Sequence, residues 1–205
     1  MRFPYSVLLS AGLLGALGGC SDSTSQGGGD PTPEQDFNLI RLAPTSPPIL
    51  NPEQSFYAVQ GEDRELRISF QDQAGGEGEE FLRLRVRPNS LRALPDGSPI
   101  PPGDSVLITV RIVDPANILF EMEPSGLTFA PGEPAELKIH YNHADHDFNE
   151  DGSIDVFDAQ IKTRLAIWRQ ELPTDPFVKL GSVNVEDQEE INADILGFSR
   201  YAISY

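Results

Sequence analysis

Residues 80–88 read Glu-Phe-Leu-Arg-Leu-Arg-Val-Arg-Pro, and this alternation of apolar and basic side chains decides the fold class. Successive side chains of a β-strand point to opposite faces, so Leu82, Leu84 and Val86 share one face and the three intervening arginines share the other. A strand with one apolar and one charged face is typical of an antiparallel sheet that packs on a core with one side only. The stretch therefore predicts such a strand over residues 80–88.

The same period of two recurs on both sides of this stretch. For example, the residues from Val106 to Ile112 alternate between apolar and polar side chains. Together with shorter runs they predict eight to ten strands, over residues 55–59, 65–70, 80–88, 105–113, 118–123, 135–141, 163–170, 178–185, 189–195 and 200–204. Turn signals such as Pro124-Ser125-Gly126 separate the strands. The expected fold class is mainly β: an antiparallel β-sandwich with an inserted loop and at most a short helix.

Three segments resemble a known sandwich domain. Residues 124–129 (PSGLTF), 135–141 and 197–202 (GFSRYA) resemble the β-sandwich shared by netrin receptors, ankyrins and many bacterial envelope proteins. The resemblance implies a non-catalytic fold that is used for contacts.

Residues 155–170 fit two periodicities. Phe157, Ile161, Leu165 and Trp168 fall on one helical face, whereas residues 161–167 also alternate as in a strand. The sandwich resemblance favours a helical turn over 155–160 followed by a strand over 163–170.

The N-terminal segment indicates where the protein is sent. A basic Arg2 precedes a short apolar run over residues 7–17, and Leu17-Gly18-Gly19-Cys20 resembles the lipobox of bacterial lipoproteins. The run is too short to span a bilayer, which takes about 20 residues. The resemblance implies a signal peptide over residues 1–19 and a lipid-modified Cys20. Ser21 after the cysteine resembles the outer-membrane sorting pattern, so we expect a lipid-anchored protein of the cell envelope, held at the outer membrane.

Composition sets the domain plan and excludes some classes of function. Residues 20–35 hold Ser, Gly, Pro and acidic residues with almost no apolar ones, which predicts a flexible tether before one domain over 36–205. The net charge is -17, so the surface repels phosphate backbones and nucleic acid is not an expected partner. The single cysteine leaves none for a disulfide, a thiolate zinc site or a cysteine nucleophile.

Residues 147–158 match the twelve-residue calcium loop. Calcium prefers six to eight oxygen ligands, and the loop would place them around one point. The expected ligands are the side chains of Asp147, Asn149 and Asp151, the carbonyl of Ser153, Asp155 directly or through water, and the closing carboxylate of Asp158. Gly152 would form the sharp turn and Ile154 would anchor the loop to apolar neighbours.

The loop has a family resemblance and an alternative. Its final Asp resembles the loop of dockerins more than that of EF-hands, which ends in Glu. Dockerins carry two such loops and only one is visible here, so a paired sensor is not expected. The alternative is an acidic, solvated loop that matches the motif by composition alone.

Two other clusters have a functional and a structural interpretation. His140, His143 and His146 could bind a transition metal, but a spacing of three in a strand that turns into a loop favours three separate polar residues. The arginines at 83, 85, 87 and 92 could bind an anionic partner such as an acidic polysaccharide, whereas the composition favours a wetted face neutralised by nearby acids.

These observations predict a non-catalytic interaction or structural module, anchored by lipid and stabilised by one calcium ion. Its expected partner is an envelope protein or a polysaccharide. The alternative is a hydrolase that acts on envelope or extracellular polymers. Gly103-Asp104-Ser105 resembles the nucleophile motif of one esterase class, but it opens a strand instead of a helix and lacks the Asp-x-x-His partner pair. No catalytic constellation is therefore predicted.

Overall fold

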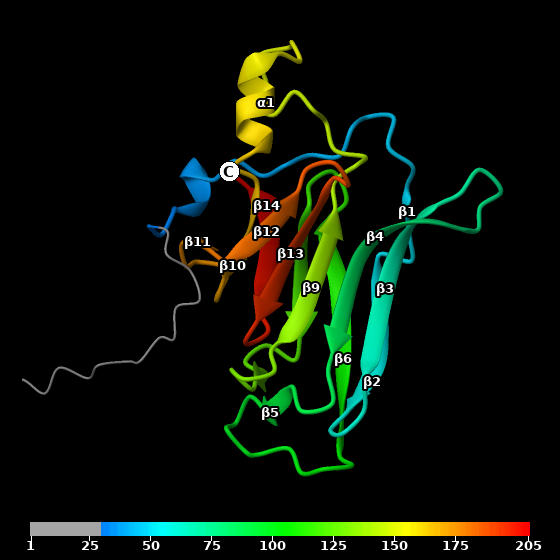
Figure 1. Cartoon of the computed structure of the whole chain (residues 1–205), viewed down its shortest axis with the longest axis vertical. Coiled ribbons are helices and arrows are strands. Elements are labelled where there is room, and N and C mark those ends of the chain that lie inside the picture. Colours follow the sequence, from blue (N-terminus) through cyan, green and yellow to red (C-terminus); the bar gives the residue numbers. More distant parts are fainter. Residues whose placement is uncertain (1–29) are drawn as a thin grey trace, which may run out of the picture.

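Two six-stranded antiparallel sheets form most of the protein (Figure 1). The computed structural model describes residues 30–205. In order across the first sheet lie β1 (Ile49–Leu50), β3 (Arg64–Gln71), β4 (Glu77–Val86), β9 (Ala135–His140), β13 (Glu190–Ile195) and β12 (Ser182–Val185). Across the second lie β11 (Val178–Lys179), β10 (Ala166–Gln170), β14 (Arg200–Ser204), β7 (Leu119–Glu123), β6 (Ser105–Asp114) and β2 (Glu53–Val59). The predicted mainly β, sandwich-like fold is confirmed.

The remaining elements are short. A two-stranded ladder joins β5 (Leu91–Ala93) to β8 (Thr128–Phe129). One 3-10 helix, η1 (Glu34–Asp36), precedes the strands, and one α-helix, α1 (Val156–Lys162), follows β9. Within residues 30–205 no helix is long and apolar enough to cross a membrane.

The stretch that predicted the fold covers the C-terminal part of β4 and the two residues after it, since the strand spans Glu77–Val86 and not residues 80–88. Leu82, Leu84 and Val86 are fully buried, while the intervening arginines lie on the outer face. Leu84 lies between Leu66 of β3 and Leu137 of β9, so three leucines form one row of the core. Burial of this row and of the facing sheet's apolar residues drives the two sheets together.

Most predicted strands differ from the observed ones by one to three residues at an end, and two differ in a more consequential way. Residues 178–185 form β11 and β12, which belong to different sheets and are separated at Leu180-Gly181. The strand predicted from residue 163 begins at Ala166, because α1 continues to Lys162. The predicted helical turn is confirmed as α1.

The first described residues, 30–39, pack against the outer face of the second sheet. Thr32 exchanges two backbone hydrogen bonds with Phe177, and Phe37 stacks on the Phe177 ring at 3.9 Å between centroids. Phe37 also covers Trp168, which is buried in this smaller outer cluster and not between the sheets. Thr32, within the segment assigned to the tether, therefore already contacts the second sheet.

Candidate functional site

The predicted calcium loop joins β9 to α1 at one end of the sandwich, where α1 projects beyond the strands (Figure 1). Asp147, at the first position of the motif, receives two backbone hydrogen bonds from further along the loop. Its Oδ1 accepts from the Asp151 amide at 3.1 Å and its Oδ2 from the Gly152 amide at 2.8 Å. Gly152 has φ +88°, which L-residues rarely adopt, and this explains the glycine of the motif.

The next two predicted ligands continue the same turn. Asn149 Oδ1 accepts from the Asp151 amide at 3.0 Å, and Asp151 Oδ1 accepts from the Ser153 amide at 2.9 Å. The Asn149 side-chain amide donates to the second Asp151 oxygen at 3.1 Å. These short-range bonds wind the backbone from Asp147 to Ser153 into a compact loop.

Asp155 and Asp158 close the loop by capping α1. Asp155 is the N-cap residue, and its Oδ1 accepts from the Phe157 amide at 2.7 Å. The Asp158 side chain completes a capping box, because its Oδ2 accepts from the Asp155 amide at 2.9 Å. The Asp158 side chain therefore caps the first turn of α1 and points back towards the loop.

Asp158 also binds the start of the loop. Its Oδ1 accepts from the Phe148 amide at 2.7 Å and from the Asn149 amide at 3.3 Å, and only 2 % of the residue is exposed. The bond from the Asp155 amide, together with those from Asn149 and Phe148, lowers the pKa of this carboxyl below its usual value. One carboxylate thus ties the first and last turns of the loop together.

Replacing Asp158 by alanine should lower the midpoint of thermal unfolding by several degrees at pH 7, because three backbone amides lose their acceptor. A carboxyl whose pKa is lowered by folding stabilises the protein above its unfolded pKa of about 3.9, and this contribution disappears as the pH falls through the folded pKa. Circular dichroism melts in calcium-free buffer should therefore show a difference at pH 7 that shrinks towards pH 3. Asp158→Asn keeps one acceptor oxygen, so its melting midpoint at pH 7 should lie between those of the unsubstituted protein and Asp158→Ala. A difference in midpoint that does not change with pH would contradict the carboxylate's role.

The structure brings the loop's ends together but does not gather its carboxylates. Within residues 30–205 no three His, Cys, Asp or Glu side chains are grouped closely enough to hold a metal ion. Ile154 was expected to anchor the loop, and this prediction is wrong: the residue is 71 % exposed. The loop is fixed instead by Phe148, which is buried in the core, and by the bonds of Asp158.

The structure also shows a contact that the sequence does not indicate. Arg41 Nη1 lies 3.2 Å from Glu150 Oε2, and the Arg41 carbonyl accepts from the Asp145 amide at 2.8 Å. Arg41 therefore contacts the calcium-loop motif at Glu150 and the residues just before it at Asp145. No local signal could have revealed this pair, because more than a hundred residues separate Arg41 from Glu150 along the chain.

The three histidines each face a different glutamate. The Nε2 atom of His140 lies 3.4 Å from Glu80, that of His143 2.9 Å from Glu79, and that of His146 3.5 Å from Glu189. In the described part of the chain these three imidazoles do not form a common metal-binding group. Their interpretation as separate polar residues has the support of this arrangement.

Two arginines of β4, and Arg87 directly after the strand, are paired with acids on the outer face of the first sheet. Arg83 lies 3.5 Å from Glu80, Arg85 donates to Asp63 at 2.9 Å, and Arg87 lies 3.0 Å from Glu136. The bond from Arg85 lowers the pKa of Asp63. Arg92 lies apart from these, on β5. A neutralised, wetted face explains the arginines of β4 without an anionic ligand.

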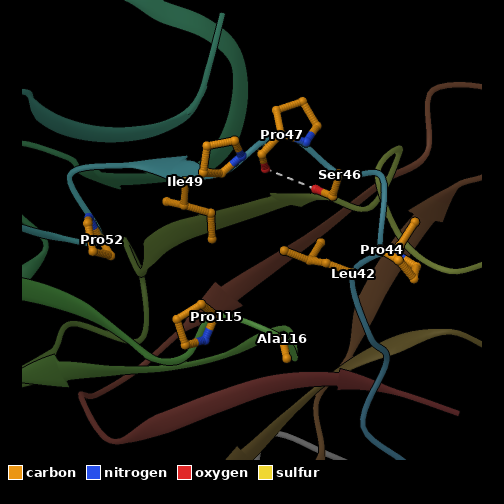
Figure 2. Close-up of a pocket in the computed structure, with 10 residues that line it drawn as sticks. Leu42, Pro44, Ser46, Pro47, Ile49, Pro52, Pro115 and Ala116 are labelled. Carbon is orange, nitrogen blue, oxygen red and sulfur yellow. Dashed lines mark hydrogen bonds between the residues drawn. The ribbon is translucent and has the colours of Figure 1, made fainter. Parts of the chain in front are cut away.

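The first of two hollows is apolar. It measures about 360 Å³ and is walled mainly by prolines of the N-terminal segment and of the turn after β6 (Figure 2). Ser46 supplies the only hydroxyl of its lining, and this hydroxyl donates to the Pro47 carbonyl at 3.1 Å. The lining contains no carboxylate or imidazole that could act as an acid or a base.

A second hollow of about 230 Å³ has an acidic lining. Of its three glutamates, Glu121 pairs with Arg111, Glu171 pairs with Arg169, and Glu123 accepts from the Ser125 amide at 2.8 Å. Groups already engaged in this way are poorly placed for general acid or base chemistry, which needs a free carboxyl beside the reacting bond.

Cys20 and the lipobox lie outside the described residues. No family model, curated protein or solved structure matches this chain. The resemblance to the netrin-receptor and ankyrin sandwich is therefore supported only at the level of a β-sandwich-like architecture.

Proposed function

We propose that this chain is a lipid-anchored envelope protein whose β-sandwich serves as a non-catalytic interaction or structural module stabilised by one calcium ion. The proposal of a non-catalytic role rests on one observation: neither hollow offers an unengaged acidic or basic side chain that could take part in catalysis. The first hollow has mainly apolar walls without a carboxylate or an imidazole, and the acids of the second are held by arginines or a backbone amide. Two broad sheet faces remain as contact surfaces.

Calcium is proposed for the loop over residues 147–158. The donors are all oxygen atoms, which calcium prefers, and the glycine turn and the closing helix stand where a calcium loop needs them. Each carboxylate has about four lone-pair positions, so oxygens that accept one or two amide bonds keep the capacity to bind an ion. Asp147, Asn149, Asp151, Ser153, Asp155 and Asp158 would hold the ion once the carboxylates turn inward.

The membrane anchor is proposed for Cys20. Its support is the Leu17-Gly18-Gly19-Cys20 motif after a short apolar run. The domain's strong negative charge provides no electrostatic attraction to anionic lipid, so acyl chains would be needed to keep it at a membrane.

Replacing Cys20 by serine should move most of the protein from the membrane fraction to the supernatant, because the acyl chains could no longer be attached. Fractionation of cells and metabolic labelling with a fatty acid measure the two effects. A matched control, Ser21→Ala, should stay in the membrane fraction and remain labelled. Retention of the Cys20 variant in membranes, with the signal peptide removed, would contradict the anchor.

A further inference from the structure

Three large apolar side chains within four consecutive residues are exposed where the loop enters α1. Ile154, Val156 and Phe157 are 71 %, 62 % and 59 % exposed, respectively. We call these three residues the apolar tip. A contiguous exposed group of this kind marks an interaction surface more often than isolated apolar residues do. The tip contributes little to the fold itself, because the buried side of the loop and helix is supplied by Phe148 and Ile161.

The described chain begins beside β11, where Thr32 pairs with Phe177, and then runs on to the α1 end of the sandwich (Figure 1). The N-terminal segment crosses the end of the sandwich below α1 (Figure 1), where Leu42 bridges Ala144 and the Ala43 amide donates to the His143 carbonyl at 2.9 Å. Nine residues lie between Cys20 and Asp30, the first described residue. Even fully extended they reach at most about 35 Å. A bilayer that held Cys20 would therefore lie within about 35 Å of Asp30, and the chain from Asp30 leads past the α1 end that carries the apolar tip (Figure 1).

The charges near the apolar tip disfavour an anionic membrane surface and are compatible with a zwitterionic one. Glu150, Asp151 and Asp155 are exposed beside it, and anionic headgroups would be repelled by them. A zwitterionic phospholipid surface has no net charge to oppose. Apolar side chains of this size enter the boundary of headgroups and acyl chains to a depth of about 5–10 Å.

We infer that the apolar tip docks on the zwitterionic surface of the bilayer that holds the lipid anchor, so that the sandwich stands on its α1 end with the opposite end facing away. This inference rests on the proposed anchoring through Cys20. It assigns the membrane contact to Ile154, Val156 and Phe157 and gives the domain a fixed orientation.

Fluorescence quenching tests the inference on the lipidated protein. Phe157→Trp places a reporter at the tip, and Tyr57→Trp places a matched reporter on β2, because Tyr57 is also exposed, at 62 %, but lies on a strand of the second sheet. Both variants are reconstituted, free of calcium, into zwitterionic vesicles whose acyl chains carry bromine. The emission of the native Trp168, which is buried, is subtracted with the unsubstituted protein.

We expect the tryptophan at position 157 to be quenched several-fold more strongly than that at position 57. Ile154→Ser and Val156→Ser, added to the position-157 reporter, should weaken the quenching, as should replacement of part of the lipid by an anionic one. Equal quenching of the two reporters, or none at position 157, would overturn the tip contact. Flotation separates the two proposals: protein that floats with the vesicles but shows no quenching disproves the tip contact and leaves the anchor in place, whereas protein that does not float disproves both.

Discussion

Truncation of Leu84 to alanine is expected to lower the free energy of unfolding by about 3 kcal/mol. Leu84 is fully buried at the centre of the first sheet, and its strand neighbours Leu66 and Leu137 are buried beside it. Strands on both sides fix the positions of these leucines, so the cavity left by the missing side chain cannot close. The loss of buried apolar surface and the remaining cavity both contribute to the cost.

Leu107→Ala is the matched control for this truncation. Leu107 also lies on a long strand, β6, but it is 49 % exposed and pairs across the sheet with the exposed Tyr57. We expect its truncation to change the free energy of unfolding by no more than about 0.5 kcal/mol. Urea unfolding followed by circular dichroism measures both variants. Comparable losses of unfolding free energy for the Leu84 and Leu107 variants would mean that the buried and exposed faces of the sheets are assigned incorrectly.

The strands could be predicted where their signal is local. In β4 the period of two extends over several residues, and one buried face is enough to produce it, so Leu82, Leu84 and Val86 reveal the strand without any knowledge of its partners. The strands β1, β5 and β8 hold only two or three residues each, which is too short for a period to appear. Their existence depends on distant partners, as in the pairing of Leu91 with Phe129.

The division between β11 and β12 also could not be predicted from a local sequence pattern. Residues 178–185 were predicted as one strand, yet the chain leaves the second sheet after Lys179 and joins the first at Ser182. Gly181 lies at this crossing. A sequence pattern indicates which residues are extended, but the sheet to which each belongs is decided by packing across the whole molecule.

The candidate site was predictable in its backbone and not in its surroundings. The twelve residues of the loop are contiguous, so the turn at Gly152 and a helical turn beginning near residue 155 could be predicted from the sequence. The brace from Arg41 to Glu150 and the separate glutamate partners of the histidines depend on residues brought together by the fold. The exposure of Ile154 was missed because the anchoring role expected of it is filled by Phe148, earlier in the same loop.

Saturating calcium is expected to raise the melting temperature of the protein by about 5–10 °C. An ion present at about 100 times its dissociation constant stabilises the folded state by about 2.7 kcal/mol, and a domain of this size gains about 2–4 °C for each kcal/mol. The gain has a specific physical source: without a cation the acidic side chains of the loop repel one another, and the ion would draw them inward. Melts with calcium, with magnesium and with chelator measure this increment.

Asp147→Ala and Asp151→Ala should each abolish most of the calcium increment, whatever they do to the melting temperature in chelator. The comparison uses the increment because Asp147 also accepts bonds from the Asp151 and Gly152 amides, so its loss weakens the loop even without metal. Asp145→Ala is the matched control: this carboxylate bonds the Asp147 amide at 3.2 Å but stands outside the twelve positions, so the increment should survive. An unchanged melting temperature in calcium, or an increment that persists in all three variants, would mean that the loop is held by its amide bonds and the Asp158 cap alone. In that case the acidic motif is a solvated turn whose resemblance to a calcium loop is compositional.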